Sequence, residues 1–276
     1  MPTKTALLLC SICCSLLLSC ANEVDASLEQ PAPVNQSDPA LAPALPAVAG
    51  TQILSEDFEA DASSGPPTRW TVIDLGKPSA TAWSIVEVEQ GQALQAIAEN
   101  AASGVSLELP ARPDSETAVA VPTLLRWRWR VDALADVDSD EQSREGDDFA
   151  ARVLVTFAER PGSSMFDAMA DAAASLAGHG QVPAAAIAYV FARDLPAGFE
   201  FTSPATERVA TVVLRGQGAE IGQWYPEQRD VSADFERLFG TPISAPNGVQ
   251  LLTDTDDAGG RACALYDDIS MTEPGS

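Results

Sequence analysis

The stretch Leu124-Leu125-Arg126-Trp127-Arg128-Trp129-Arg130-Val131 alternates strictly between apolar and charged side chains. Successive side chains of a β-strand point to opposite faces of the sheet, so this period of two predicts a strand with one buried face. The buried face is expected to carry Leu125, Trp127, Trp129 and Val131, and the other face to carry Arg126, Arg128 and Arg130. This strand fixes the expected class of the fold.

Further short apolar runs, separated by turn residues, surround this stretch. The expected strands lie near residues 52–59, 69–75, 82–88, 92–98, 103–109, 124–132, 149–158, 186–193, 207–215, 247–253 and 262–271. About eleven short strands with few helical patterns predict an all-β fold, a β-sandwich or jelly roll, formed by residues 51–276 as one domain.

Two segments have the pattern of helices. Residues 163–177 carry an apolar stripe and form an expected inserted helix between two strands, while residues 232–238 form a short capped helix before Gly240. An apolar stripe usually packs on its own domain, so the 163–177 helix is expected to dock on the sandwich. A lid or a surface for a protein partner is the alternative for this helix.

The N-terminus has the pattern of a targeting signal. The apolar run at residues 6–18 is shorter than the roughly 20 residues that span a bilayer, and it follows a short segment with one cation, Lys4. The run ends in Leu17-Leu18-Ser19-Cys20, which resembles the bacterial lipobox, in which the cysteine is lipidated. Residues 1–19 are therefore expected to be a lipoprotein signal peptide, with an ordinary secretory signal cleaved elsewhere or a buried apolar segment as the alternatives.

The expected location follows from the residues after Cys20. Position 21 is Ala, and no Asp stands there to signal retention in the inner membrane, so the prediction is an outer-membrane lipoprotein facing the periplasm. Residues 20–50 are rich in Ala and Pro and read as a tether without a core of its own. Membrane contact is expected through the lipid anchor only.

Composition excludes several classes of function. There are 16 Lys+Arg against 40 Asp+Glu, a net charge of −24, which repels nucleic acid phosphates, so no nucleic-acid partner is expected. The single histidine, His179, excludes sites built from two or three imidazoles. Cys263 is the one cysteine after Cys20, so a disulfide framework is not expected, and this thiol is predicted to be buried.

One acidic segment resembles the start of a calcium loop. The segment Asp254-Thr255-Asp256-Asp257 has clustered carboxylates, but Leu265 stands where an EF-hand requires Glu. No organic cofactor is expected. A looser Ca²⁺ site from Asp254, Asp256 and Asp267 remains as an alternative to a solvated acidic turn.

Charged residues also gather on the second face of the predicted sheet. In the strand 149–158, Phe149, Val153, Val155 and Phe157 are expected in the core and Arg152 on the other face. Sequential strands often pair, which would place Arg128 or Arg130 beside Arg152. Near the C-terminus, Tyr266 and Asp268 are expected opposite to Cys263, Leu265 and Ile269. These arginines form either a ligand-binding face or an arginine–aspartate ladder on a solvated sheet.

An ordered set of motifs resembles a bacterial family known only as domain of unknown function 3047. The motifs are residues 125–131, 146–153, 188–192, 224–231 with Asp234 and 239–240, 253–256 and 266–269. The resemblance implies no activity. It matches Asp148, Arg152, Trp224, Arg229, Asp254, Asp256 and Asp268 to motif positions. The chain departs from the family at Asp267, where the family often has glycine before the last aspartate.

Three functions remain open at this point. The leading prediction is a lipid-anchored, non-catalytic module that binds a glycan or other polar ligand, with Trp224, Tyr225 or Tyr266 stacking on sugars. Its expected binding residues are Arg128, Arg130, Asp148, Arg152, Trp224, Arg229, Tyr266 and Asp268. One alternative is a glycoside hydrolase that uses Asp148 with Asp254 or Asp268. The other is a structural or assembly lipoprotein that binds an envelope protein.

Overall fold

The fold is taken from a computed structural model that describes residues 49–61, 65–110, 123–158, 183–241 and 245–274. These residues belong to one compact unit, Leu41–Ser276. The expected signal peptide, the Cys20 lipidation site, residues 20–48 of the tether, the 163–177 helix and His179 lie outside the described residues.

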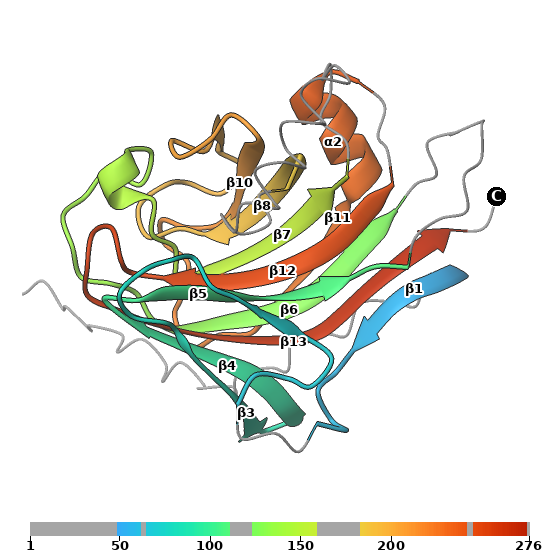
Figure 1. Cartoon of the computed structure of the whole chain (residues 1–276), viewed down its shortest axis with the longest axis horizontal. Coiled ribbons are helices and arrows are strands. Elements are labelled where there is room, and N and C mark those ends of the chain that lie inside the picture. Colours follow the sequence, from blue (N-terminus) through green and yellow to red (C-terminus); the bar gives the residue numbers. More distant parts are fainter. Residues whose placement is uncertain (1–48, 62–64, 111–122, 159–182, 242–244, 275–276) are drawn as a thin grey trace, which may run out of the picture. The chain divides into compact units, whose positions relative to one another are not determined.

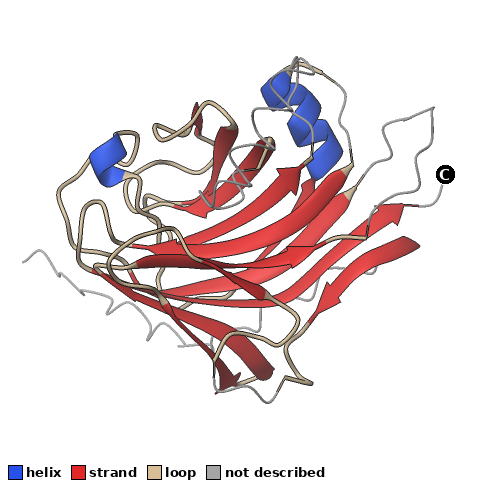
Figure 2. Cartoon of the chain, viewed as in Figure 1, coloured by secondary structure: helices blue, strands red, loops and turns tan. Residues whose placement is uncertain are grey.

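Thirteen strands form two sheets that face each other as a β-sandwich (Figures 1 and 2). The first sheet has the order β11-β6-β13-β4-β3, with β1 also paired to β13, and the second has the order β2-β5-β12-β7-β8-β10-β9. The strands are β1 (Gly50–Glu56), β2 (Thr71–Ile73), β3 (Ala82–Val88), β4 (Gly91–Glu99), β5 (Ala102–Glu108), β6 (Leu124–Ala133), β7 (Ala151–Phe157), β8 (Ala185–Phe191), β9 (Glu200–Thr202), β10 (Val209–Arg215), β11 (Tyr225–Asp230), β12 (Pro246–Asp254) and β13 (Arg261–Pro274). The predicted all-β sandwich is confirmed, and each of the eleven expected strands is present.

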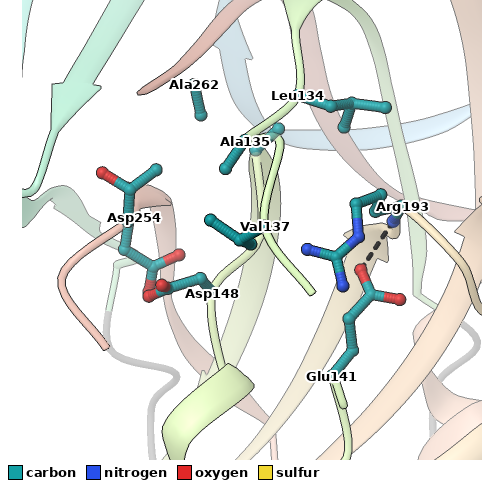
Figure 3. A pocket seen from close by; sticks show the side chains of 10 residues that line it. Leu134, Ala135, Val137, Glu141, Asp148, Arg193, Asp254 and Ala262 are labelled. Atoms are coloured by element: carbon teal, nitrogen blue, oxygen red, sulfur yellow. Dashed lines mark hydrogen bonds between the residues drawn. The ribbon is translucent and has the colours of Figure 1, made fainter. Parts of the chain in front are cut away.

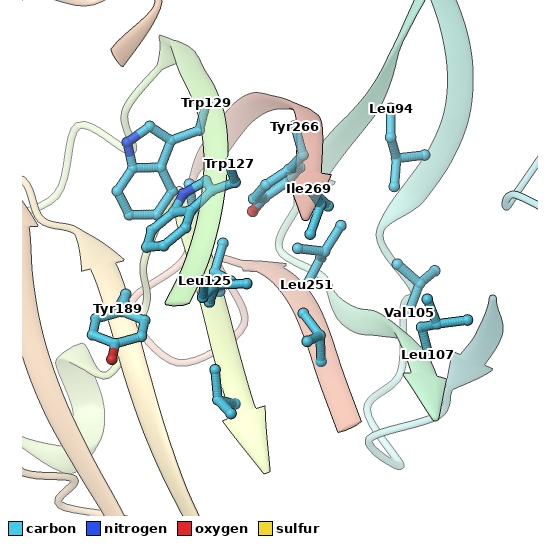
Figure 4. Close-up of a cluster of buried hydrophobic side chains, with 14 of the residues drawn as sticks. Leu94, Val105, Leu107, Leu125, Trp127, Trp129, Tyr189, Leu251, Tyr266 and Ile269 are labelled. Carbon is cyan, nitrogen blue, oxygen red and sulfur yellow. The ribbon is translucent and has the colours of Figure 1, made fainter. Parts of the chain in front are cut away.

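The alternating stretch in β6 behaves as its period of two predicts. Trp127 and Trp129 are almost fully buried, and the alternating arginines Arg126, Arg128 and Arg130 are only partly covered. The two indole rings meet edge to face, 5.4 Å apart, and Trp127 also packs against Tyr189 of the opposite sheet (Figure 4). Burial of such large side chains stabilises the interface between the sheets, because each removes about 150–250 Å² from water.

One expected pairing is wrong. Strands β6 and β7 do not pair: β6 lies between β11 and β13 in the first sheet, and β7 lies between β12 and β8 in the second. The acidic connection between them crosses from one sheet to the other and includes a short 3-10 helix, η1 (Arg144–Gly146). Phe149 is buried as expected, but it belongs to a separate apolar cluster and does not share the central core with Val153, Val155 and Phe157.

Strand β13 is the longest of the described strands, and a β-bulge in it changes which of its side chains face the core. Its register with β6 shifts between Asp267 and Ser270, so that Tyr266 and Ile269 both enter the core. Tyr266 is fully buried, whereas Leu265 is absent from the central core cluster. The expected direction of the Tyr266 side chain is therefore wrong, because the bulge breaks the simple alternation that the prediction assumed.

Helix α2 (Val231–Phe239) confirms the predicted short helix. The Asp230 carboxylate accepts hydrogen bonds from the N–H groups of Ser232 (3.1 Å) and Ala233 (3.0 Å), which caps the start of the helix. The helix ends at Gly240, whose φ of 71° suits glycine. Among the described residues, no helix is long and apolar enough to cross a membrane.

Candidate functional site

The outer side of β6 carries a row of three arginines that are held by neighbouring side chains. Arg126 Nε donates to Gln228 Oε1 on β11 (2.8 Å), and Arg128 Nη1 donates to Gln90 Oε1 in the β3–β4 turn (2.5 Å). Arg130 forms a two-pronged contact with Asp132 of its own strand, at 2.7 and 2.9 Å. We call Arg126, Arg128 and Arg130 the arginine row.

The bulge in β13 places two consecutive carboxylates beside Arg128. Arg128 Nε donates to Asp267 Oδ2 at 3.1 Å and lies 3.0 Å from Asp268 Oδ2. Asp268 has a φ of 51°, in the left-handed region where a non-glycine residue is strained. The Asp267 side chain is 2% exposed and that of Asp268 is 61% exposed. A regular strand would present only one of these carboxylates on this face.

Trp224 lies over the arginine row. The guanidinium carbons of Arg128 and Arg130 stand 4.7 and 5.4 Å from the ring centroid, so the indole makes cation–π contacts with two cations. Register explains this position: Pro226 of β11 faces Arg128, and Trp224 lies two residues further along the same side.

The loop before β11 holds Trp224 in place. Gly222 N–H donates to the Val131 carbonyl of β6 at 2.7 Å. The Tyr225 hydroxyl donates to the carbonyl of Glu220 (3.1 Å) and accepts from its N–H (2.9 Å). Because the loop is fixed at both points, the indole is positioned before any ligand arrives. We call Trp224, the arginine row, Gln90, Gln228, Asp267 and Asp268 the Trp224 face.

Burial tunes the electrostatics of this face. Desolvation raises the pKa of Asp267 to about 6, although hydrogen bonding and charge attraction from Arg128 favour the carboxylate. Asp267 is therefore mostly ionised at neutral pH and forms a covered ion pair with Arg128. Four of the predicted binding residues, Arg128, Arg130, Trp224 and Asp268, meet on the Trp224 face.

Arg152 lies elsewhere and is part of a buried network. On β7 of the second sheet, its guanidinium Nη1 donates to Asp147 Oδ1 (3.0 Å) and Nη2 donates to Asp254 Oδ2 (2.7 Å). It also stacks over the Phe149 ring at 4.6 Å. Both side chains of the Arg152–Asp254 pair are about 10% exposed, so these contacts support the fold rather than face solvent.

Tyr266 and Arg229 are also held by the interior. The Tyr266 hydroxyl donates to the Leu252 carbonyl at 2.7 Å, and its ring is fully buried, which keeps it from stacking on a surface ligand. Arg229 is bound by Asp234 of α2 through contacts of 2.8 and 2.6 Å. Asp234 also accepts from the Tyr189 hydroxyl at 2.8 Å, which ties the helix to the core.

The carboxylates of the expected calcium site do not assemble as a set. Asp254 pairs with Arg152, Asp267 pairs with Arg128, and Asp256 is the only member left in the acidic turn. A different trio, Asp148, Asp256 and Asp257, has one carboxylate oxygen from each residue within 4.8 Å of the others.

Lys77 places a cation against this acidic trio. Its ammonium pairs with Asp256 and lies 3.2 Å from Asp257 Oδ1. Lys77 is the only lysine in the described residues, and these contacts raise its pKa. Asp148 instead accepts from the N–H groups of Asp257 (3.2 Å) and Ala258 (2.6 Å), which folds the turn back onto the chain before β7. Two of the three carboxylates thus share one side-chain cation.

The carboxyl pair considered for hydrolysis lines a very small cavity. Asp148 and Asp254 lie on one side of it and Glu141 and Arg193 on the other, with Val137 between them (Figure 3). Burial raises the pKa of Asp254 to about 7 against the opposing charge of Arg152. The cavity volume is about 20 Å³, enough for about one water molecule but not for a sugar ring.

Several residues of the Trp224 face were not predicted. Asp132 stands two residues after Arg130 on the same side of the strand, so the alternation in the sequence could have identified it. Gln228 reaches the arginine row from the neighbouring strand β11 and Gln90 from the β3–β4 turn; both are far from the row in sequence, and no local pattern marks them. The β-bulge that gathers Asp267 and Asp268 likewise has no sequence signature here.

Comparison with known proteins adds a family and a set of distant structures. Residues 68–270 match the family described as "Protein of unknown function (DUF3047)". None of the curated proteins matches the chain. Similar solved structures include the family 11 carbohydrate-binding module from Clostridium thermocellum in complex with a mixed-linked tetrasaccharide, at 10% identity and a TM-score of 0.39, covering 83% of this chain and 98% of that chain.

Two further structures are similar at the same distant level. The K3 adhesin domain of Lys-gingipain from Porphyromonas gingivalis has 12% identity and a TM-score of 0.35, covering 81% of this chain and 99% of that chain. The xyloglucanase domain of NopAA from Sinorhizobium fredii, in complex with cellobiose, has 9% identity and a TM-score of 0.31, covering 76% and 99%. The function of the present chain therefore has to be derived from its own residues.

Proposed function

Because the chain belongs to the DUF3047 family, whose function is unknown, we propose a function from its own surface: a non-catalytic β-sandwich module that binds a glycan or another polar ligand. The single observation that carries this proposal is the half-buried indole of Trp224, in cation–π contact with two guanidinium groups, one of which pairs with the exposed carboxylate of Asp268. A fixed aromatic face surrounded by hydrogen-bonding groups is the arrangement that suits a sugar ring.

The chemistry of the face supports binding rather than hydrolysis. Sugar rings present apolar C–H faces that pack on an aromatic ring, and their hydroxyl groups pair with amides and carboxylates at the rim. Gln90 and Gln228 are exposed amides beside the row, and Asp268 is an exposed acceptor. Backbone strain at Asp268 marks the same place, since strained residues cluster at ligand sites.

We also propose that the chain works at the cell envelope. The support is the Leu17-Leu18-Ser19-Cys20 pattern with its upstream apolar run, which assigns lipidation to Cys20. An outer-membrane lipoprotein with its domain in the periplasm would present the Trp224 face to glycans or to envelope proteins. Labelling with a palmitate analogue, compared between the parent chain and Cys20→Ala, tests the anchor directly.

The binding experiment uses the whole chain and its Trp224→Ala variant. Each is incubated with peptidoglycan sacculi and a panel of insoluble polysaccharides, and both pelleted protein and new reducing ends are measured. We expect Trp224→Ala to weaken binding roughly tenfold or more, the usual loss for a central aromatic contact. The control is Val72→Ala, which trims another exposed apolar side chain, on β2 of the second sheet.

Stability must stay nearly constant for this result to count. Trp224 is half-buried and its cation–π contacts are worth about 0.5–1 kcal/mol, so only a small change in melting temperature is expected. Binding that is equal in the parent and the Trp224→Ala variant would refute the proposed site. New reducing ends in the parent reaction would refute the non-catalytic assignment.

A further inference from the structure

We infer that the Trp224 face accepts uncharged glycans and rejects glycans that carry carboxylates or sulfates. This inference rests on the proposed binding function and names the class of ligand for the same site. It follows from the way in which the two arginines that contact the indole, Arg128 and Arg130, are already paired with carboxylates of the protein.

The face has no excess positive charge to offer. The three cations of the arginine row stand against the carboxylates of Asp132, Asp267 and Asp268, so the charges of this set balance. Arg128 contacts two of these carboxylates and Arg130 contacts the third. Arg126 donates to the Gln228 amide. An anionic ligand against the indole would need the guanidinium of Arg128 or Arg130 to be free of its carboxylate partner.

Arg128 cannot be released cheaply for a new anion. Its partner Asp267 is 2% exposed, so turning the guanidinium toward a ligand would leave a buried carboxylate without its counter-ion. Loss of one partner from a buried ion pair is strongly destabilising, because the remaining charge is neither solvated nor paired. The ion pair therefore holds the guanidinium under the indole as a support rather than as an anion receptor.

Long-range charge acts in the same direction. The chain carries a net charge of −24, and the exposed carboxylate of Asp268 stands at the edge of the face. A polyanionic chain that approaches this surface is repelled at distances within the screening length, about 10 Å in 0.1 M salt. An uncharged chain meets no such barrier and can use the indole, the Gln90 and Gln228 amides and the Asp268 carboxylate as partners.

The test compares pairs of polymers that share a backbone and differ in charge. The pairs are hydroxyethyl cellulose with carboxymethyl cellulose, dextran with dextran sulfate, and methyl-esterified pectin with polygalacturonate. The whole chain and its Trp224→Ala variant are run in native affinity gels with each polymer. The substitution leaves the net charge unchanged, so binding that depends on charge alone is equal in both proteins.

For at least one pair, we expect the parent to bind the neutral polymer at least roughly tenfold more tightly than the anionic polymer. We also expect the binding to the neutral polymer to depend on Trp224. The difference should shrink in about 0.5 M NaCl, where charges are screened within a few ångströms. Asp268→Asn removes one negative charge, and asparagine suits a left-handed backbone. This variant should therefore also show a smaller difference in affinity between the neutral and the anionic polymer.

The outcomes separate the two proposals. Trp224-dependent binding that is equal or tighter for the anionic member would overturn this inference and leave the proposed binding function standing. Absence of Trp224-dependent binding to any polymer here and in the pelleting assay would overturn both. A preference for the neutral member that is unchanged by salt and by Asp268→Asn would overturn the electrostatic cause that we assign.

Discussion

Arg152 offers the sharpest test of which residues build the fold and which face a ligand. The Arg152→Met variant keeps much of the side-chain volume but removes the guanidinium that pairs with Asp147 and Asp254. The carboxylates of Asp147 and Asp254 then remain without this cation, and each of these side chains is only about 10% exposed. Breaking a buried ion pair by removing one partner costs about 3–5 kcal/mol. We expect a loss of that size in the free energy of unfolding at pH 8.

The loss should depend on pH in a defined direction. Burial raises the pKa of Asp254 to about 7 even beside Arg152, and removal of the cation raises this pKa further. At pH 5 the Asp254 carboxyl of the variant is protonated and no longer a buried charge, so the destabilisation should be clearly smaller than at pH 8. Urea unfolding followed by tryptophan fluorescence at both pH values measures the difference.

A matched control separates this effect from the loss of any arginine. Arg261→Met removes a guanidinium that pairs with Glu99 at the surface, where the two side chains are 51% and 67% exposed. Such pairs contribute about 0–1 kcal/mol, so this variant should unfold nearly like the parent. If Arg152→Met costs less than about 1 kcal/mol at pH 8, or if its cost is the same at pH 5, the buried network does not act as argued.

Three further predictions concern other charged residues. Burial raises the pKa of Asp267 to about 6 in the folded protein, above an unfolded value near 4. The folded state therefore binds a proton more tightly at Asp267, and the free energy of unfolding falls as pH rises from 4 to 6. Asp267→Asn should flatten this part of a curve of melting temperature against pH, and an unchanged slope would contradict the assignment. Lys77→Met should leave Asp256 and Asp257 without their ammonium partner. Millimolar Ca²⁺ should then raise the melting temperature of the variant more than that of the parent. Equal shifts in melting temperature would show that the lysine does not compete with a divalent ion. Asp230→Ala should lower the free energy of urea unfolding by about 1 kcal/mol through loss of the helix cap, whereas Asp230→Asn should retain most of it.

The sequence predicts the strands of this fold well because local patterns determine them. Alternation in residues 124–131 identifies a half-buried strand, and a short helical segment that ends before Gly240 identifies α2. The missed strands are β9, which has three residues, and β11, which contains Pro226 and four charged or amide side chains. An edge strand such as β11 tolerates proline, so its composition does not resemble that of a buried strand.

The site is predicted only in part, because its assembly depends on contacts between distant strands. Trp224 and Arg130 meet since β11 pairs with β6 across about a hundred residues of sequence, and no local pattern reveals that register. Arg152 carries the same chemistry as Arg128 but lies in the other sheet. Tyr266 is turned inward by a bulge, and a bulge of this kind can be recognised only when both strands are known.

The pairing of β1 with β13 has a mechanical consequence. Gly50, at the start of the domain, faces Pro274 near its end, and the next pairs run antiparallel along the longest strand. A force that pulls on the chain ahead of Gly50 would act first on the Gly50–Pro274 pair, and so on the pairing of β1 with β13 before that of any other strands. Strand β6 separates that ladder from β11, so tension on the preceding chain would peel β1 from the sheet while the indole beside β11 stays in place.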